Sequence, residues 1–252
     1  MELDWRSLGS FVRQRALRCY HSKPIQIAED LFALRLVGVN VFLLGREELT
    51  LVDTGMKGDH APILEAIKFL GRKPTDLKHI LITHRHTDHT GGLQKLKQAT
   101  GADVYMHSLG AAKIAMGDAY SPLEVHAPFP WKLPIQCLKF VAPRNVDPCD
   151  VDVRVEDGEV LGIEGGIQAI YTPGHCRGHV CYLWERHGGV LFAGDAISNM
   201  FGLGLSPLYE DIIEGKHSIR KLEKENFATI CFGHGKELTH NAKARLERLS
   251  LD

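Results

Sequence analysis

Four potential metal ligands lie within the segment Thr83-His84-Arg85-His86-Thr87-Asp88-His89-Thr90-Gly91-Gly92. This segment follows a short apolar run at residues 79–83, which is typical of a buried strand, and it leads into a helix expected at residues 91–101. His84 and His86 are two positions apart, so both side chains can point the same way while the chain stays extended. Asp88 and His89 follow where the chain tightens and can point toward a second position. The segment therefore predicts a turn at the end of a strand that can supply ligands to two metal ions.

Strand and helix patterns alternate along the rest of the chain. Strands are expected at residues 31–44, 49–52, 79–83, 104–107, 151–155, 159–161, 167–171, 180–183, 190–193 and 228–232, and helices at 59–70, 91–101, 208–224 and 237–249. This order predicts an α/β protein built in layers. A weak internal repeat adds to this, because each half contains a hairpin pattern followed by an aspartate, Asp53 or Asp195.

The length of 252 residues and the ordinary share of hydrophobic residues, 44%, predict one folded domain over residues 1–252. Residues 1–30 are expected to form an N-terminal extension. Residues 120–148 contain many prolines and predict an irregular insertion with at most a short strand at 135–140. A substrate lid and a plain surface connection both fit such an insertion.

Charge and cysteine content argue against several classes of protein. Thirty basic residues stand against thirty-one acidic ones, so no overall field favours nucleic acid or an anionic membrane surface. Met1–Tyr20 has no uninterrupted apolar run, so neither a signal peptide nor a membrane span is expected, and a cytoplasmic location is predicted. Six cysteines without a CxxC pair are expected to be mostly reduced and buried.

Three further ligand candidates lie far from the first segment. They are His175 in Tyr171-Thr-Pro-Gly-His-Cys176, Asp195 in Ala193-Gly-Asp-Ala196, and His234 in Phe232-Gly-His-Gly235. Each follows an expected strand and lies beside glycine, which lets the backbone approach a crowded site. Imidazole and carboxylate ligands suit zinc, and sites that keep an open position are typical of catalysis.

The order of these motifs resembles the metallo-β-lactamase superfamily over nearly the whole chain. The resemblance implies a four-layer αββα sandwich with two mixed sheets. It also implies that His84, His86 and His175 hold one metal, that Asp88, His89 and His234 hold a second, and that Asp195 bridges the two. Asp53 is then expected to support the site without binding metal. His179, four residues after His175, resembles a variant of lactonase-like and thioesterase-like branches, and it is expected to have a similar supporting role.

Two divalent cations can share a water molecule, lower its pKa and provide hydroxide for attack on a carbonyl or phosphoryl group. Asp88 is expected to orient this hydroxide and to carry its proton to the leaving group. Within the family, Asp195 differs from the Cys or Ser of true β-lactamases, and His86 differs from the Glu of flavodiiron proteins. The single helix expected after His234 is shorter than the helical domain of glyoxalase II. The prediction is a zinc-dependent hydrolase of ester-like carbonyls, a lactonase or thioesterase.

Several alternatives stay open from the sequence. A persulfide dioxygenase with one iron shares the HxHxDH pattern, and a phosphodiesterase of the same fold would use the same ligands. Manganese or iron can replace zinc in such a set. A small-molecule substrate is expected, with no nucleic-acid or membrane partner, and a dimer is among the possible states. Residues 197–204, together with Phe129 and Trp131, either line an apolar pocket or pack beneath loops.

Overall fold

The computed structural model describes residues 23–251, and its largest element is a seven-stranded mixed sheet. In spatial order the strands are β1 (Ile25–Ala28), β2 (Leu31–Arg35), β3 (Asn40–Leu44), β4 (Leu49–Val52), β5 (Leu77–Ile82), β6 (Asp103–His107) and β8 (Val153–Val155). Neighbours from β1 to β4 are antiparallel, and neighbours from β4 to β8 are parallel. The parallel strands are rich in Val, Ile and Leu and are largely buried, as expected for a covered sheet.

A smaller mixed sheet has five strands. Their order is β16 (Thr229–Phe232), β12 (Val190–Gly194), β11 (Val180–Trp184), β10 (Ile167–Tyr171) and β9 (Val160–Leu161). Here β12 and β16 are parallel, and the other neighbours are antiparallel. The two sheets share one arrangement, because the β3–β4 hairpin continues into parallel β5 and the β11–β12 hairpin continues into parallel β16. This matches the weak repeat seen in the sequence.

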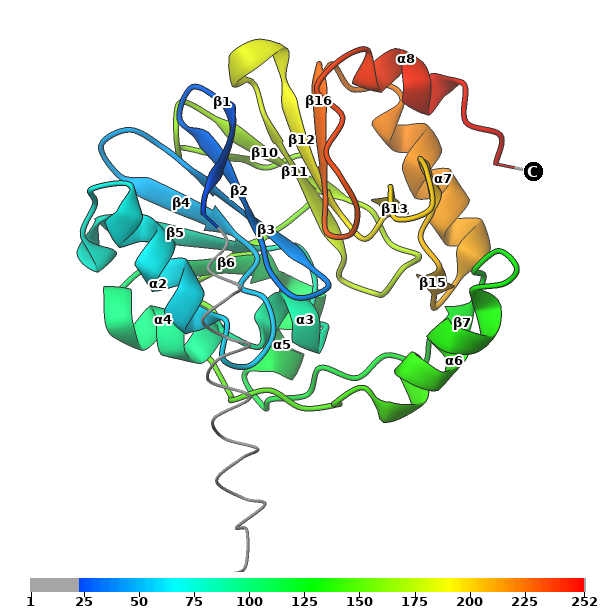
Figure 1. The fold of residues 1–252 in the computed structure, drawn as a ribbon, viewed down its shortest axis with the longest axis horizontal. Helices are drawn as coiled ribbons and strands as arrows, with labels where there is room; N and C mark the ends of the chain where they lie inside the picture. The colour runs from blue at the N-terminus through cyan, green and yellow to red at the C-terminus, as the bar shows by residue number, and fades with distance from the viewer. Residues whose placement is uncertain (1–22, 252) are drawn as a thin grey trace, which may run out of the picture.

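Helices cover the outer faces of the two sheets (Figure 1). The larger sheet carries α2 (His60–Phe69), α4 (Leu93–Thr100) and α5 (Ser108–Ile114), and the smaller sheet carries α7 (Ile212–Leu222) and α8 (Ala242–Glu247). Between the sheets lies an apolar layer that includes Phe42, Tyr182, Trp184 and Phe192. Three apolar clusters thus separate four layers. The predicted αββα sandwich with two mixed sheets is confirmed.

Residues 120–148 differ from the prediction, because the strand expected at 135–140 is part of helix α6 (Lys132–Val141). Pro134 lies in the first turn of this helix, where a missing N–H costs no helical hydrogen bond. The backbone N–H of Ile135 donates to the Trp131 carbonyl at 3.0 Å and starts the helix. The same insertion contributes β7 (Glu124–Val125), which pairs with β15 (Leu208–Tyr209). The insertion is therefore partly regular and is tied to the second half of the chain.

Three expected helices are shorter in the structure. The one expected at 91–101 is α4, which covers only Leu93–Thr100. An additional short helix that was not predicted, α3 (Thr87–Thr90), precedes it, so Asp88 and His89 lie on a helical turn. The one expected at 208–224 starts only at α7, because the Asp211 side chain accepts hydrogen bonds from the N–H groups of Ile213 and Glu214. The one expected at 237–249 is reduced to α8. The remaining short elements are β13 (Ile197–Ser198), β14 (Gly204–Leu205) and the 3₁₀ turns η1 (Pro74–Asp76) and η2 (Arg186–Gly188).

The structure describes only part of the N-terminal segment for which the sequence makes predictions. The apolar pattern of Met1–Tyr20 and most of the extension at 1–30 lie outside the described residues, whereas residues 25–28 form β1 at the edge of the larger sheet. Among residues 23–251, no helix is long and apolar enough to cross a membrane. Four of the five cysteines in this range are buried, and Cys137 is exposed.

Candidate metal centre

Seven side chains predicted as metal ligands come together where strands β5, β10, β12 and β16 end. They are His84, His86, Asp88, His89, His175, Asp195 and His234, called here the histidine–aspartate cluster. Their ligand atoms form three overlapping groups, each with all atoms within 4.8 Å of one another. We call His84, His86 and His175 the three-histidine group, and Asp88, His89 and His234 the carboxylate group. A third set, in which Asp195 joins two histidines, connects them.

The turn after β5 is held against the loop after β4 by close backbone contact. The N–H of Thr54 donates to the His89 carbonyl at 2.8 Å, and the N–H of Gly91 donates to the Gly55 carbonyl at 2.8 Å. A Cβ atom on Gly91 would lie 2.3 Å from the backbone nitrogen of Lys57, and one on Gly92 would lie 2.4 Å from the Thr54 carbonyl oxygen. The two glycines after the histidines are therefore needed for this packing.

Hydrogen bonds orient the rings of the three-histidine group. Nδ1 of His175 lies 2.7 Å from the carbonyl oxygen of Leu208, which can only accept. Nδ1 therefore carries the proton in the neutral ring, and the lone pair of Nε2 faces Nδ1 of His86 at 2.9 Å. Nδ1 of His84 contacts the Thr83 hydroxyl at 3.0 Å, which turns Nε2 of His84 toward the cluster.

The carboxylate group meets Asp195 through His234. Nε2 of His234 lies 3.2 Å from an oxygen of Asp88 and 3.2 Å from an oxygen of Asp195. On its other side, Nδ1 of His234 donates to the Gly38 carbonyl at 2.6 Å, which fixes the ring. Asp195 also lies 3.6 Å from Nε2 of His175. Asp195 thus contacts both groups, as expected for a shared ligand.

The two groups differ in protonation. Burial is the main cause that lowers the pKa of His84, His86 and His175, so these rings are neutral near pH 7. A neutral imidazole is the form that binds a metal ion.

In the carboxylate group the pKa shifts run the other way. Burial opposes protonation of His89, but the carboxylates of Asp88, Asp195 and Asp53 together raise its pKa to about 9. Burial likewise opposes protonation of His234, and Asp195 and Asp88 raise its pKa well above the usual value. Protonated rings between carboxylates balance charge in the way that a cation would.

Asp53 has the position that the sequence predicts for a supporting residue. One of its carboxylate oxygens lies 2.8 Å from Nδ1 of His89, so the other ring nitrogen faces the cluster. The Asp53 carboxylate also accepts from the N–H and hydroxyl of Thr83 at 2.8 to 3.0 Å. Its backbone has φ of 60°, a left-handed conformation that Asp tolerates better than most residues.

His179 has both ring nitrogens engaged away from a ligand position. Nε2 accepts from the backbone N–H of Asp195 at 3.1 Å, so Nδ1 carries the proton and donates to the Thr172 hydroxyl at 2.9 Å. A Cβ atom on Gly194 would lie 2.7 Å from Nε2 of His179, so only glycine leaves room for this ring. The structure places His179 as a support for the backbone that carries Asp195.

Arg85 lies between His84 and His86, and the sequence did not predict a role for it. Its guanidinium donates to the carbonyls of Tyr120 and Arg177 at 2.8 to 3.1 Å and pairs with Glu210 at 3.2 Å. Arg85 therefore joins the turn after β5 to the insertion and to the loop that carries His175. A cation in a turn between two buried ligands has to find such partners, because an unpaired buried charge is costly.

Several buried polar atoms of the cluster have no hydrogen-bond partner in residues 23–251. They are Nε2 of His84, His86 and His89, and Oδ1 of Asp195. Buried polar atoms in folded proteins nearly always have a partner, so a concentration of unpaired ones indicates a missing ligand. Nitrogen and carboxylate donors suit zinc, manganese or iron. The residues of the cluster therefore fit divalent metal ions.

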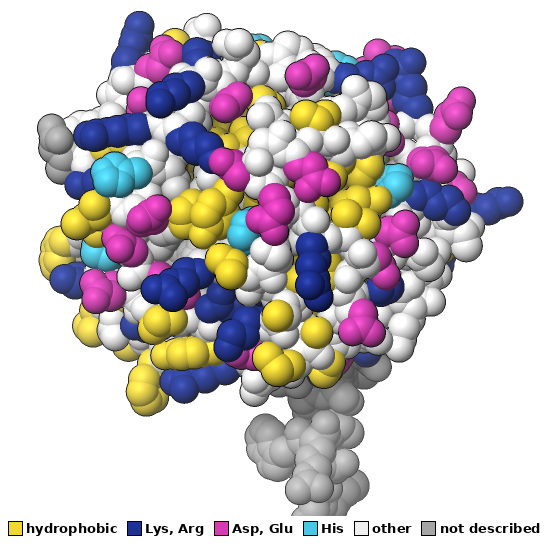
Figure 2. Space-filling model, turned by 180° about the vertical axis from the view of Figure 1, so that it is seen from behind, with side chains coloured by type: hydrophobic (Ala, Val, Ile, Leu, Met, Phe, Trp, Pro, Cys, Tyr) yellow, Lys and Arg dark blue, Asp and Glu magenta, His cyan; other side chains and the backbone are white. Residues whose placement is uncertain are grey.

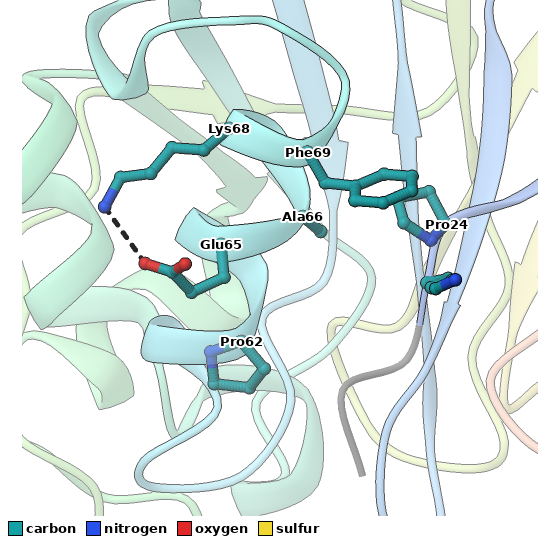
Figure 3. A pocket seen from close by; sticks show the side chains of 7 residues that line it. Pro24, Pro62, Glu65, Ala66, Lys68 and Phe69 are labelled. Carbon is teal, nitrogen blue, oxygen red and sulfur yellow. Dashed lines mark hydrogen bonds and ion pairs between the residues drawn. The ribbon is translucent and has the colours of Figure 1, made fainter. Parts of the chain in front are cut away.

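A separate hollow of about 290 Å³ lies on the outer helical layer (Figure 3). It is lined by Lys23, Pro24, Pro62, Glu65, Ala66, Lys68 and Phe69. The ring of Phe69 faces Pro24, while Lys68 and Glu65 form a 3.0 Å ion pair. None of these side chains belongs to the cluster, so this hollow is not the candidate metal centre.

The chain matches the model of the metallo-beta-lactamase superfamily over residues 34–234, and it belongs to this superfamily. A solved metallo-beta-lactamase from Cronobacter sakazakii shares the fold, with a TM-score of 0.66, 23% identity, and coverage of 84% of this chain and 80% of that one.

Two curated relatives are hydrolases by name. A hydroxyacylglutathione hydrolase of Rhodospirillum rubrum is 32% identical over 69% of this chain and 53% of its own length. An atrochrysone carboxyl ACP thioesterase of Emericella nidulans is 27% identical over 81% of this chain and 53% of its own length. The chain thus spans about half the length of these relatives.

Proposed function

We propose that this protein is a metal-dependent hydrolase that cleaves an ester-like carbonyl compound, either a thioester or a lactone. The proposed centre holds two divalent ions, which we expect to be zinc. The observation that carries the proposal is the position of Asp195, which lies within 3.6 Å of a ring nitrogen from each ligand group. Two ligand groups that share one carboxylate are what a paired metal centre requires.

The three-histidine group would hold one ion, and the carboxylate group would hold the other. Asp195 would contribute to both sites. Bound there, the ions would supply a water molecule of lowered pKa and would polarise the substrate carbonyl. The protein itself contributes fixed rings and a buried surrounding. Leu208 orients His175, Gly38 orients His234 and Asp53 orients His89, so the ligand atoms are held in place before metal or substrate binds.

Asp88 is the residue that we assign to proton transfer. Its side chain is 24% exposed, compared with 8% for Asp195, so it is the carboxylate of the cluster that a substrate can approach. Burial raises the pKa of Asp88, but His89 and His234 lower it below its usual value, which leaves an ionised carboxylate at neutral pH. Such a group can orient the attacking water, accept its proton and pass it to the leaving group.

The relatives favour thioesters among the ester-like substrates. One is named as a thioesterase and another as an acylglutathione hydrolase. The proposed substrate is accordingly a small-molecule or carrier-bound acyl compound.

The test combines elemental analysis of the purified protein with a panel of thioesters, lactones, phosphodiesters and cephalosporins. We expect about two metal equivalents per chain and turnover of thioesters or lactones. One iron per chain together with oxygen consumption on a persulfide would replace the hydrolase proposal with a dioxygenase. Turnover restricted to phosphodiesters would keep the metal centre but reject the ester-like substrate.

A further inference from the structure

Exposed aromatic side chains gather beside the candidate metal centre, from two segments far apart in the sequence. The rings of Trp131 and Phe201 are stacked, with centroids 5.1 Å apart and planes at 22°. Trp131 is 47% exposed and Phe201 39% exposed, and neighbouring Phe129 and Met200 are exposed as well. We call Trp131 and Phe201 the aromatic platform. Figure 2 shows hydrophobic side chains gathered along the lower edge of the molecule, on the side where α6 lies.

The Phe201 side of the platform is anchored to a cluster residue. The backbone N–H of Asn199 donates to the His234 carbonyl at 3.1 Å, and the Ser198 hydroxyl contacts the same carbonyl at 3.4 Å. A Cβ atom on Gly235 would lie 2.2 Å from the Asn199 carbonyl carbon, so the two backbones are in direct contact. Phe201 therefore lies two residues from Asn199, which forms a strand-like bridge with Gly235, the residue after His234.

The Trp131 side is anchored to a different cluster residue. Strand β7 pairs with β15, with Val125 opposite Leu208, and the N–H of His126 donates to the Pro207 carbonyl at 2.8 Å. The carbonyl of Leu208 is the group that orients His175. The segment that leads to Trp131 is thus bound to the strand that fixes His175. The two segments that carry the platform are thus each anchored beside a residue of a different ligand group, His234 for one and His175 for the other.

Stacked aromatic rings that stay half exposed leave apolar surface in contact with water, which is unfavourable unless a partner covers it. Apolar surface beside a few polar catalytic groups is the usual composition of a small-molecule site. The partner has to reach both the platform and the cluster. An ester-like substrate with an apolar acyl group meets both requirements, because its carbonyl binds at the cluster and its acyl group extends over the rings.

We propose that the aromatic platform binds the apolar acyl group of the substrate and sets the preference for long acyl groups. This inference rests on the proposed ester hydrolysis. Each CH₂ group that leaves water contributes a roughly fixed free energy, so rates should rise with chain length. If the platform buries half of the surface of each CH₂ group, the expected gain in kcat/KM is about twofold per group.

The first experiment measures kcat/KM for thioesters of one thiol with acetyl, butanoyl, hexanoyl and octanoyl groups. We expect the octanoyl-to-acetyl ratio to be at least about tenfold in the unmodified protein and to fall to within about threefold in Trp131→Ala/Phe201→Ala. Phe69→Ala is the matched control, because this exposed ring lies on the outer helix α2. It should leave the ratio unchanged. An unchanged ratio in the double variant would overturn the inference.

A second series keeps the acetyl group and lengthens the thiol. A gain that appears only in this series would show that the platform binds the leaving group and would overturn the assignment to the acyl group. The unmodified protein could instead be a dimer that the double substitution converts to a monomer without changing the octanoyl-to-acetyl ratio. This result would show that the surface binds a second copy of the chain, and it would also overturn the inference.

The third measurement needs no turnover, so it separates the inference from the proposed function. Decanoate and acetate are added to the metal-loaded protein while tryptophan fluorescence is recorded. The measurement uses a Trp5→Phe background, so that only Trp131 and the buried Trp184 contribute to the emission. We expect decanoate, but not acetate, to shift the emission, and the further change Trp131→Phe to abolish the shift. If no ester-like substrate is hydrolysed but decanoate still shifts the emission, the proposed function is wrong, whereas the binding of apolar chains by the aromatic platform is supported. If decanoate causes no shift in the protein that retains Trp131, the aromatic platform does not bind apolar chains and the inference is wrong.

Discussion

The two halves of the histidine–aspartate cluster differ in charge. The three-histidine group offers three ring nitrogens and no carboxylate, whereas the carboxylate group contains Asp88 and lies against Asp195. Burial lowers the pKa of the imidazoles in the first group, while nearby carboxylates raise it in the second. The first group is therefore ready to accept a cation near pH 7. In the second, protons on the imidazoles balance the carboxylates until a cation replaces them.

This difference indicates separate tasks. A site of neutral nitrogens retains metal and polarises a carbonyl, whereas a site with an accessible carboxylate also handles protons. The halves should then respond differently when one ligand is removed.

The largest expected effect comes from Asp88→Ala. Removal of this carboxylate deletes both a proposed metal ligand and the proposed proton carrier, so we expect kcat to fall by at least about a hundredfold. The three-histidine group stays complete, and metal content should drop from about two equivalents to about one. Elemental analysis and steady-state kinetics measure the two effects. Full activity in this variant would reject the role assigned to Asp88, and loss of both metals would reject the independence of the two halves.

The comparison also explains which parts of the site the sequence predicts. Asp88, His89 and the first two histidines lie in one short segment, so local spacing alone places them near one another. His175, Asp195 and His234 were predictable as strand-end residues beside glycine, but their convergence depends on strand order, and only the family resemblance supplied it. Hydrogen-bond partners such as the Leu208 carbonyl leave no signal in the sequence, because any residue has a carbonyl group.

The insertion shows where prediction fails. Ile135 and its neighbours form a short apolar run, which is equally typical of a strand and of a helix segment, and the surrounding prolines favoured an irregular chain. The first helical turn tolerates Pro134, so α6 forms. The stacking of Trp131 on Phe201 joins segments seventy positions apart, and no local pattern predicts such a contact.

A smaller effect is expected from Asp53→Asn. Asn tolerates the left-handed backbone at this position, so the fold should persist, but the carboxylate that orients His89 is lost. Substitutions of groups that orient metal ligands typically weaken metal binding by about ten- to a hundredfold. We expect this loss for the second metal only, measured by competition with a chromophoric chelator. Equal weakening of both metals would contradict the link between Asp53 and the carboxylate group.

The smallest effect concerns the pH dependence of metal binding. The proton on His89, whose pKa is raised to about 9, has to leave before this ring can bind metal, so metal affinity should rise with pH. Release of the His89 proton alone gives about a tenfold gain from about pH 6 to about pH 7, and release of the proton on His234, whose pKa is also raised, adds to this gain. The three-histidine group should gain less over this range, because burial already lowers the pKa values of its rings. Stepwise zinc titration of the unmodified protein and of Asp88→Ala, which retains only the three-histidine group intact, separates the two steps. The same pH slope in both proteins would show that the two halves do not differ in protonation.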